Sequence, residues 1–157
     1  MERKNKNLTK SEIIKLRNLT GAGIMDAKRA LQQAKGDFNK AVEIIKAQGL
    51  ELAKKKSQRQ AKQGLIECYV HCRGAIGVIC EINCETDFVA KNKEFKELAH
   101  EIAMQIAAMA PKNVDELLKS SYIRDEKITI ADLIRGKVTR FGENIKITRF
   151  VRYKLGE

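Results

Sequence analysis

Apolar residues recur at helical spacing over residues 9–49. The pattern opens on Thr9 and Glu12, which are spaced as in a capping box. Gly36 and Gly49 stand where helices commonly end. We therefore expect three short amphipathic helices with two tight joints. The periodic apolar positions are Ile13, Leu16, Leu19, Met25, Ala27, Ala30, Leu31, Ala34, Phe38, Ala41, Ile44, Ile45 and Ala47.

A basic connector and two strand-like runs follow. Residues 50–63 are rich in Ala, Lys and Gln and show only a thin apolar stripe, which favours a helical connector. The runs LIECYVHC and AIGVICEIN flank a short Arg-Gly loop. They predict an antiparallel hairpin in which His71 pairs with Ile76.

A long amphipathic helix is predicted after the hairpin. Apolar residues from Phe95 to Ala107 lie on one face of a helix of about 18 residues, a length suited to burial against a sheet. Pro111, the only proline, marks the exit from this helix. Residues 112–128 are weakly patterned, with one helical turn expected at VDELLKS.

The C-terminal part predicts a short helix and a final strand. Thr129 and Asp132 are spaced to cap a helix over residues 129–138. Over residues 143–155 apolar residues alternate and then change phase, as in a strand with a bulge or a twist. The fold class is therefore α+β, with a small antiparallel sheet packed with helices. The expected parts are a three-helix module (1–49), a helical connector (50–63) and an α+β core (64–157).

The composition fits a globular, intracellular protein. Of the 157 residues, 43% are hydrophobic, which is enough to build real cores. No apolar stretch approaches the roughly 20 residues of a membrane span, so no membrane contact is expected. The basic start MERKNKNLTK is not followed by the apolar segment of a secretory signal.

The net charge of +11 predicts attraction to a polyanion or to an acidic protein surface. The surplus lies in the N-terminal tail and in AKKKSQRQAK (53–62). A basic RNA-binding protein is therefore the alternative reading. Reading single strands usually requires aromatic side chains on a sheet beside basic ones, and the chain lacks that pattern. Nucleic acid is not the partner we expect.

No catalytic residue, cofactor or metal site is predicted. The TGAG sequence at 20–23 lacks the Lys-Ser/Thr ending of a phosphate loop and lies between helices. His100 and Glu101 begin like a zinc-protease helix, but residue 104 is methionine. Neither histidine has an obvious nucleophile partner. We therefore expect that the protein is not an enzyme.

The four cysteines occur as two C-x3-C pairs, whereas structural zinc usually prefers C-x2-C loops. The hairpin register puts Cys68 and Cys72 on one face and Cys80 on the other. We interpret Cys68, Cys72, Cys80 and Cys84 as small buried thiols and not as ligands of a zinc-dependent enzyme.

Several segments make the chain resemble one protein family. LRNLTGAGIMDAKRALQQAKGDFNKAV is similar to the N-terminal module of elongation factor Ts. GVICEINCETDFVAKNKEF resembles the most distinctive core segment of that family. AKKKSQRQAKQG and GENIKITRFVRYKLG match the family pattern in the same order. The resemblance covers most of the chain and is weakest over residues 112–128.

The resemblance implies a guanine-nucleotide exchange factor for elongation factor Tu. In that family a ubiquitin-associated-like three-helix module docks on the nucleotide-binding domain of Tu. A Thr-Asp-Phe-Val turn inserts its aromatic ring near the Mg²⁺ and phosphate site. The partner-binding residues carried over to this chain are Thr86, Asp87, Phe88 and Val89 in the turn, and Leu16, Ile24 and Met25 in the module.

The residues alone leave the role of Phe88 open. A ring in a connector could fill the core of its own chain or bind another protein, and the resemblance favours binding. Ile24 and Met25 could likewise be core residues of the module. The resemblance also implies a homodimer, because this chain carries one core subdomain where longer members carry two. A bacterial-type cytoplasmic location is expected, with an organellar matrix or stroma as the alternative.

Overall fold

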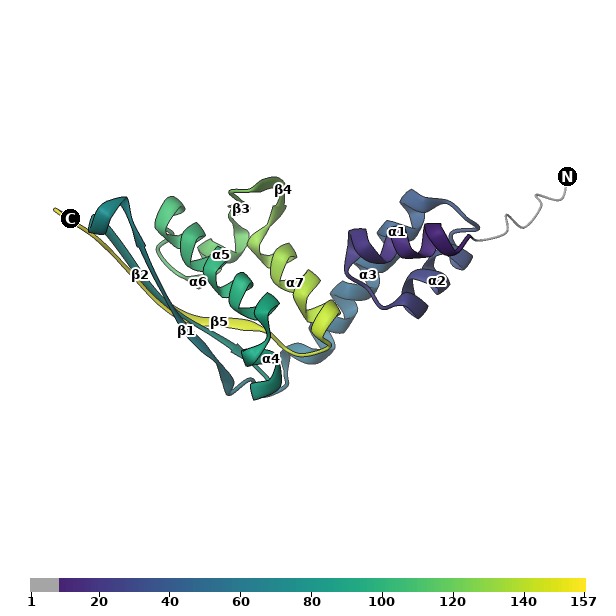
Figure 1. Ribbon diagram of the computed structural model, residues 1–157, viewed down its shortest axis with the longest axis horizontal. Helices are drawn as coiled ribbons and strands as arrows, with labels where there is room; N and C mark the ends of the chain where they lie inside the picture. Colours follow the sequence, from purple (N-terminus) through teal and green to yellow (C-terminus); the bar gives the residue numbers. More distant parts are fainter. Residues whose placement is uncertain (1–8) are drawn as a thin grey trace, which may run out of the picture. The chain divides into compact units, whose positions relative to one another are not determined.

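In the computed structural model, residues 9–157 are described, and they form two compact units (Figure 1). The smaller unit consists of the described residues up to Lys56 together with Arg135–Gly142. The larger unit consists of Ser57–Ile134 and Glu143–Glu157. Apart from Thr9 and Lys10, the basic N-terminal tail lies outside the described residues. The chain thus contributes to the smaller unit from two separate segments.

The smaller unit contains α1 (Lys10–Thr20), α2 (Ile24–Gln33), α3 (Phe38–Ser57) and the last part of α7 (Ile130–Phe141). The predicted capping box is confirmed, because Thr9 N–H donates to the Glu12 carboxylate at 3.0 Å and Glu12 N–H donates to the Thr9 hydroxyl at 3.3 Å. Gly21 ends α1 at a φ of +71°, a left-handed conformation that glycine adopts without strain.

Small side chains let the helices of this unit pack closely. Ala27, Ala30 and Ala41 are completely buried, as are the larger Leu16 and Leu31. Burying each leucine contributes roughly 1.5–3 kcal/mol, so these two supply much of the stability of so small a core. The predicted three-helix core is therefore present.

The third helix is longer than predicted. We expected it to end at Gly49, but α3 continues to Ser57 and takes in much of the predicted connector. Gly49 is buried, and a Cβ atom there would lie 3.0 Å from the hydroxyl of Thr139 on α7. The predicted helix end is wrong because this glycine makes room for a packed helix and does not stop α3.

The larger unit is built on a three-stranded antiparallel sheet, in the order β1 (Gln63–His71), β2 (Ile76–Cys84), β5 (Lys146–Lys154). The predicted pairing of His71 with Ile76 is confirmed, across a short 3-10 turn. The predicted bulge in the last strand is also confirmed. Glu81 pairs with Arg149 whereas Ile82 pairs with Ile147, which leaves Thr148 as the extra residue.

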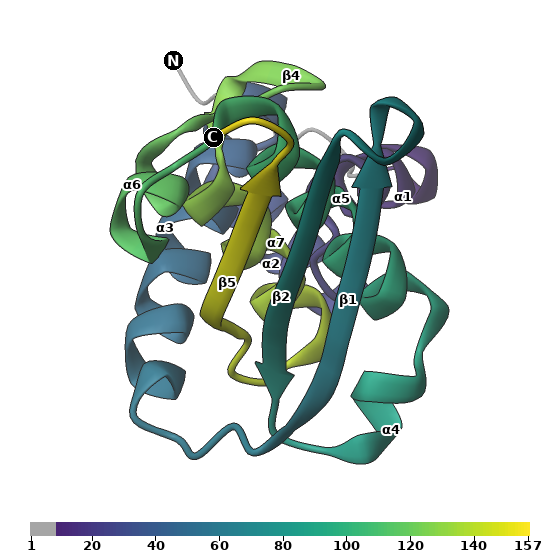
Figure 2. The same ribbon diagram turned by 90° about the vertical axis from the view of Figure 1, so that its left-hand side faces the viewer.

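One face of this sheet is covered by α5 (Lys93–Met109), as predicted (Figure 1). Phe95, Ile102 and Ile106 on α5 are completely buried, and Val78 and Ile82 on β2 are buried under them. Strand alternation sends the neighbouring residues of β2 to the opposite face. Figure 2 looks onto that opposite face, and among the described residues of the larger unit no element covers it.

Residues 112–128 hold more structure than their weak pattern predicted. They form α6 (Val114–Lys119), β3 (Ser121–Tyr122) and most of β4 (Asp125–Thr129). The predicted helical turn is confirmed, and the two-stranded sheet is an addition. The buried amide of Gln105 on α5 donates to Ser121 O at 2.8 Å and accepts from Ile123 N at 2.9 Å. This region is therefore organised by a distant polar side chain.

The α+β fold class, with helices packed on a small antiparallel sheet, is confirmed. One prediction about the cysteines is wrong in part. Cys80 and Cys84 are buried, but Cys68 and Cys72 are exposed. Hairpin alternation places Cys68 on the uncovered face, and Cys72 belongs to the turn. None of the helices described here is both long and apolar enough to cross a membrane.

Candidate partner-binding surfaces

The Thr-Asp-Phe-Val segment forms a short helix, α4 (Asp87–Lys91), directly after β2. Thr86 is its N-cap, and the Thr86 hydroxyl accepts a hydrogen bond from Val89 N–H at 3.3 Å. Successive residues of a helix point about 100° apart, so Phe88 and Val89 diverge. Val89 is 6% exposed and anchors the turn, whereas Phe88 is 80% exposed. The alternative that Phe88 fills the core of its own chain is therefore wrong.

Asp87 lies beside the exposed ring and pairs with a lysine one turn later. The Lys91 ammonium donates to the Asp87 carboxylate at 2.7 Å. This hydrogen bond and the lysine charge lower the pKa of Asp87, which is on the surface. Asp87 is thus charged near neutral pH, and the exposed face of α4 carries a ring next to a salt bridge.

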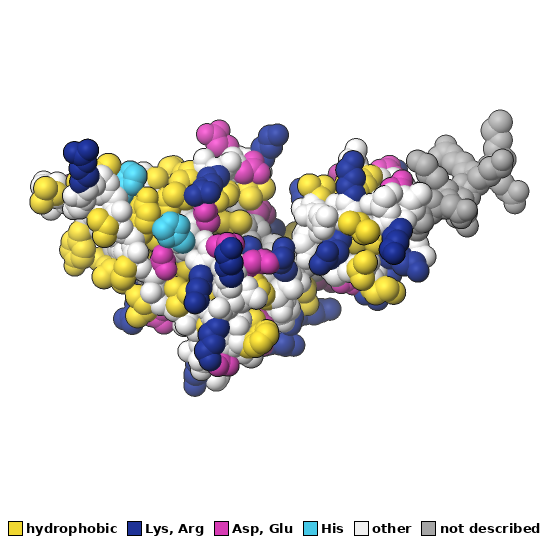
Figure 3. All heavy atoms as spheres, in the orientation of Figure 1, with side chains coloured by type: hydrophobic (Ala, Val, Ile, Leu, Met, Phe, Trp, Pro, Cys, Tyr) yellow, Lys and Arg dark blue, Asp and Glu magenta, His cyan; other side chains and the backbone are white. Residues whose placement is uncertain are grey.

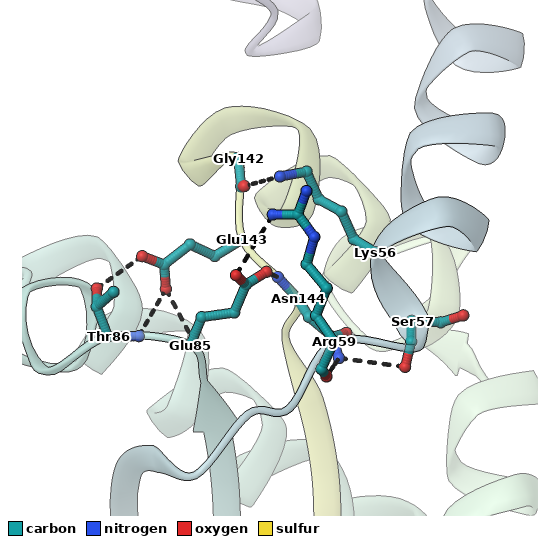
Figure 4. A network of polar contacts seen from close by, with 8 residues as sticks. All are labelled: Lys56, Ser57, Arg59, Glu85, Thr86, Gly142, Glu143 and Asn144. Atoms are coloured by element: carbon teal, nitrogen blue, oxygen red, sulfur yellow. Dashed lines mark hydrogen bonds and ion pairs between the residues drawn. The ribbon is translucent and has the colours of Figure 1, made fainter.

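Two glutamates exchange hydrogen bonds with the backbone at the start of this turn (Figure 4). One Glu143 carboxylate oxygen accepts from Glu85 N–H at 3.1 Å and from Thr86 N–H at 3.0 Å. The other accepts from the Thr86 hydroxyl at 2.6 Å. In return, the Glu85 carboxylate accepts from Asn144 N–H at 2.6 Å. We refer to Glu85, Thr86, Glu143 and Asn144 as the carboxylate clasp.

The clasp is extended toward the segment that follows α3. The Asn144 side chain donates to Arg59 O at 2.8 Å and to Ser57 O at 3.4 Å, and the Arg59 guanidinium lies 3.5 Å from the Glu85 carboxylate (Figure 4). All of these atoms belong to the larger unit. Three segments far apart in the sequence therefore meet at the base of α4.

Cys84 lies at the end of β2 and packs against the same turn. Its thiol donates to Thr86 O at 3.1 Å, and the side chain is completely buried. Burial, and to a smaller degree the Glu143 carboxylate, raise the pKa of Cys84 to about 11. The thiol is therefore protonated at neutral pH and poorly reactive.

A second candidate surface lies on the smaller unit. Leu19 at the end of α1 and Ile24 and Met25 at the start of α2 are 66%, 51% and 59% exposed. Figure 3 shows hydrophobic side chains among lysines and arginines on the visible face of this unit. Leu16, predicted to face a partner, is completely buried in the helical core. Leu16 therefore supports the surface from below and is not part of it.

The surface on the smaller unit adjoins a basic groove. Arg17, Asn18, Ile24 and Arg140 line it together with the glycine-rich joint between α1 and α2, and its volume is about 680 Å³. Arginine side chains beside apolar ones suit a partner that is both apolar and acidic.

A third candidate surface is the uncovered face of the sheet (Figure 2). Its register places three residues in each row across β1, β2 and β5, and Cys68, Ile79 and Val151 form the middle row. We call this surface the open sheet face. Its exposed apolar side chains are Ile66, Val70, Ile79, Val151 and Tyr153.

Metal binding finds no support in the part of the chain that the structure describes. No group of three or more His, Cys, Asp or Glu side chains is arranged there to hold a metal ion. Both histidines lie near Tyr69 instead. The His100 ring contacts the Glu67 carboxylate at 3.0 Å, and His71 stacks on Tyr69.

The chain is similar to known proteins of one family. The family model described as Elongation factor TS matches residues 85–157, which include α4 and both clasp glutamates. Elongation factor Ts of Carboxydothermus hydrogenoformans is 42% identical over 96% of this chain and 90% of its own length. Those of Coprothermobacter proteolyticus and Thermotoga maritima are each 40% identical, over 96% and 92% of this chain and 99% and 94% of their own lengths.

The fold and the exposed side chains define a two-unit α+β protein that presents apolar groups outward from each unit. The comparisons place it more narrowly, and the chain belongs to the elongation factor Ts family. The alignment with the Carboxydothermus protein spans 195 positions, more than the 157 residues here. That relative therefore carries residues within the aligned region that have no counterpart in this chain.

Sequence reasoning found the α4 residues but missed the clasp. Glu143 lies in GENIKITRFVRYKLG, which carries the family resemblance, yet its role has no local signature. Glu85 directly precedes the Thr-Asp-Phe-Val turn, and Arg59 lies in the basic run 53–62, whose charge gives no sign of a contact with Glu85. Leu19 fits the periodic apolar pattern of the first helix as well as Leu16 does, so periodicity alone gives no sign that it is exposed.

Proposed function

We propose that this chain is a guanine-nucleotide exchange factor for elongation factor Tu in translation elongation. In this proposal α4 inserts Phe88 near the Mg²⁺ and phosphate site of Tu, and GDP leaves faster. Membership of the elongation factor Ts family supports the reaction. The observation that carries the role of α4 is the 80% exposure of Phe88, on a turn whose neighbouring Val89 is anchored.

The proposed mechanism forms no covalent bond and requires no cofactor. If the factor weakens nucleotide binding a thousandfold, about 4 kcal/mol of coupling is required, and bound nucleotide weakens factor binding equally. Burying one phenylalanine side chain yields roughly 1.5–3 kcal/mol. Phe88 therefore supplies only part of this coupling, and a second contact is needed to hold the factor on Tu.

We assign that second contact to the surface formed by Leu19, Ile24 and Met25. These side chains stand on a packed helical core, so little conformational freedom is lost when they bind. Arg17 and Arg140 beside them favour an acidic rim on the partner. Thr86 and Asp87 flank the inserted ring at α4, and the predicted role of Val89 becomes that of an internal anchor.

The proposed test is release of fluorescent GDP from Tu, timed with wild type and Phe88→Ala. The variant should slow exchange by one to two orders of magnitude, consistent with the loss of roughly 1.5–3 kcal/mol of burial. Leu155→Ala is the matched control, because Leu155 is also large, apolar and 84% exposed. Equal rates for wild type and Phe88→Ala would contradict the proposed role of the ring. A wild-type chain that does not accelerate release would contradict the exchange function itself.

We further propose that the protein is a homodimer and that the open sheet face is its interface. A contiguous apolar sheet surface is normally covered in a stable protein, and a second copy would cover it by packing sheet on sheet. Ile79→Lys places a charge in the middle row and should yield monomers at micromolar concentration, measured by light scattering. Met109→Lys alters a similarly exposed residue outside this face and should leave the mass unchanged. A wild-type monomer would contradict the proposal.

RNA binding has weaker support. The open sheet face carries Tyr153 as its one clearly exposed aromatic side chain in the described structure, whereas stacking of single strands uses several. The lysines in the last turn of α3 suit solvation or an acidic protein equally well. An exchange factor of this family is expected to work in the cytoplasm or in the matrix or stroma of an organelle.

A further inference from the structure

The conformation of α4 cannot come from its own five residues. Isolated helices shorter than about 12–15 residues are marginal in water, because fixing the backbone of the first turn costs more free energy than its hydrogen bonds contribute. The direction of Phe88 therefore depends on contacts between α4 and other parts of the larger unit. Val89 supplies one of them by burial, and the carboxylate clasp supplies the others at the N-terminal end.

Glu143 determines how the Thr86 hydroxyl is used. A hydroxyl group has one proton to donate and two lone pairs that accept. The Thr86 proton goes to the Glu143 carboxylate at 2.6 Å, which leaves the oxygen free to accept Val89 N–H at 3.3 Å. The N-cap that starts α4 is thus oriented by a residue 57 positions away in the sequence.

Glu143 also binds the backbone that leads into the cap. A single carboxylate oxygen accepts the N–H groups of Glu85 and Thr86, so the peptide planes at both residues are held by the same atom. Hydrogen bonds to an ionised acceptor are roughly twice as strong as neutral ones. The reciprocal bond from Asn144 N–H to Glu85 keeps Glu143 itself in place.

We propose that Glu143 is a positioning residue for nucleotide exchange, which presets the direction of Phe88 through the Thr86 cap before Tu is bound. This inference rests on the proposed function. Glu143 makes no contact with nucleotide in this scheme. It lowers the ordering cost that Phe88 would otherwise meet on insertion, as preorganisation does at other interfaces.

The first test replaces Glu143 with glutamine, which has nearly the same shape but only one acceptor oxygen. If the glutamine oxygen keeps the two backbone N–H groups, its NH2 group faces the Thr86 hydroxyl, which loses the acceptor of its proton. The remaining bonds are no longer charge-assisted and are therefore weaker. GDP release at saturating factor should slow about tenfold. Glu97→Gln is the matched control, because Glu97 makes an exposed salt bridge with Lys93 on α5.

A double variant separates positioning from general destabilisation. If Glu143 acts through Phe88, then Phe88→Ala with Glu143→Gln should release GDP at the rate of Phe88→Ala alone. If Glu143→Gln slows both backgrounds by the same factor, the inference is overturned. Thr86→Val, which removes the hydroxyl at equal size, should resemble Glu143→Gln, and Thr86→Ser should keep most of the activity.

A measurement on the free chain does not depend on Tu. Amide hydrogen exchange of Val89 and Ala90 reports the first turn of α4, because their N–H groups bond to Thr86. Glu143→Gln should accelerate exchange at these two amides by tenfold or more, and Glu97→Gln should not. Unchanged protection of these amides in Glu143→Gln would overturn the inference, whatever the result of the GDP-release assay. A wild-type chain that does not accelerate GDP release would by itself overturn only the proposed function.

Discussion

The two units present exposed apolar side chains by different physical means. In the smaller unit, Ile24 and Met25 project from a helix that is fixed by a core of leucines and alanines beneath it. In the larger unit, Phe88 projects from a single helical turn that is held by one buried valine and the carboxylate clasp. Hydrophobic packing therefore supports the first surface, whereas directional hydrogen bonds support the second.

This difference leads to different sensitivities. A core tolerates changes at its surface but not beneath it, because cavities are costly. A hydrogen-bonded turn responds instead to changes of one atom in an acceptor, because its hydrogen bonds are weakened or lose their partner. The proposed division of labour follows: the smaller unit holds the factor on Tu, and α4 acts on the nucleotide site.

The largest expected effect concerns the core of the smaller unit. Leu16→Ala removes a completely buried side chain and should destabilise this unit by about 2–5 kcal/mol. Leu19→Ala, three residues later and 66% exposed, should change stability by less than about 0.5 kcal/mol. Thermal denaturation followed by circular dichroism measures both. Similar losses for the two variants would mean that packing does not support this surface.

The next effect concerns binding without loss of stability. The double variant Ile24→Ala with Met25→Ala removes exposed apolar area that we expect to be buried on Tu, worth ~1.5–3 kcal/mol. The factor concentration for half-maximal GDP release should rise about ten- to a hundredfold, while the rate at saturation stays near that of wild type. Phe88→Ala should instead lower the rate at saturation. A lowered rate at saturation in the double variant would contradict the proposal that this surface contributes to binding and α4 to nucleotide release.

The smallest expected effect is on the reactivity of a single thiol, that of Cys84 beneath α4. Burial raises the pKa of Cys84 to about 11, so its reactive thiolate is scarce at pH 8 and increases only as the pH approaches that value. Iodoacetamide at pH 8 should therefore modify Cys84 far more slowly than the exposed Cys72. Mass spectrometry of the labelled peptides measures both. Fast labelling of Cys84 in the wild type would mean that the turn opens readily.

The sequence predicted elements well where one local pattern decided them. The capping box at Thr9, the pairing of His71 with Ile76 and the bulge near Thr148 depend on residues close in sequence or on strand alternation. The prediction was wrong where packing between helices determined the end of an element. Gly49 was expected to end a helix, because an isolated glycine gives the same signal whether it caps a helix or admits a neighbouring one.

In the candidate site, too, the sequence identified the residues, whereas packing determined which of them are exposed. Phe88 and its neighbours could be recognised from a contiguous motif, but the motif did not reveal that Val89 is an anchor and Phe88 an exposed ring. Leu16 and Leu19 both fit the apolar period of one helix. Only the packing of the helices places Leu16 in the core and leaves Leu19 on the surface.

The sequence by itself determined α1, α2 and the start of α3, the hairpin and the residues of the turn, because helical and strand periodicities are local. The tertiary structure alone decided that Glu143 binds the backbone at Glu85 and Thr86, and that α7 contributes to both units. The physical reason is that a hydrogen bond between residues 57 or 58 positions apart leaves no period in the chain. Its partners become neighbours only when β2 and the segment before β5 are brought together.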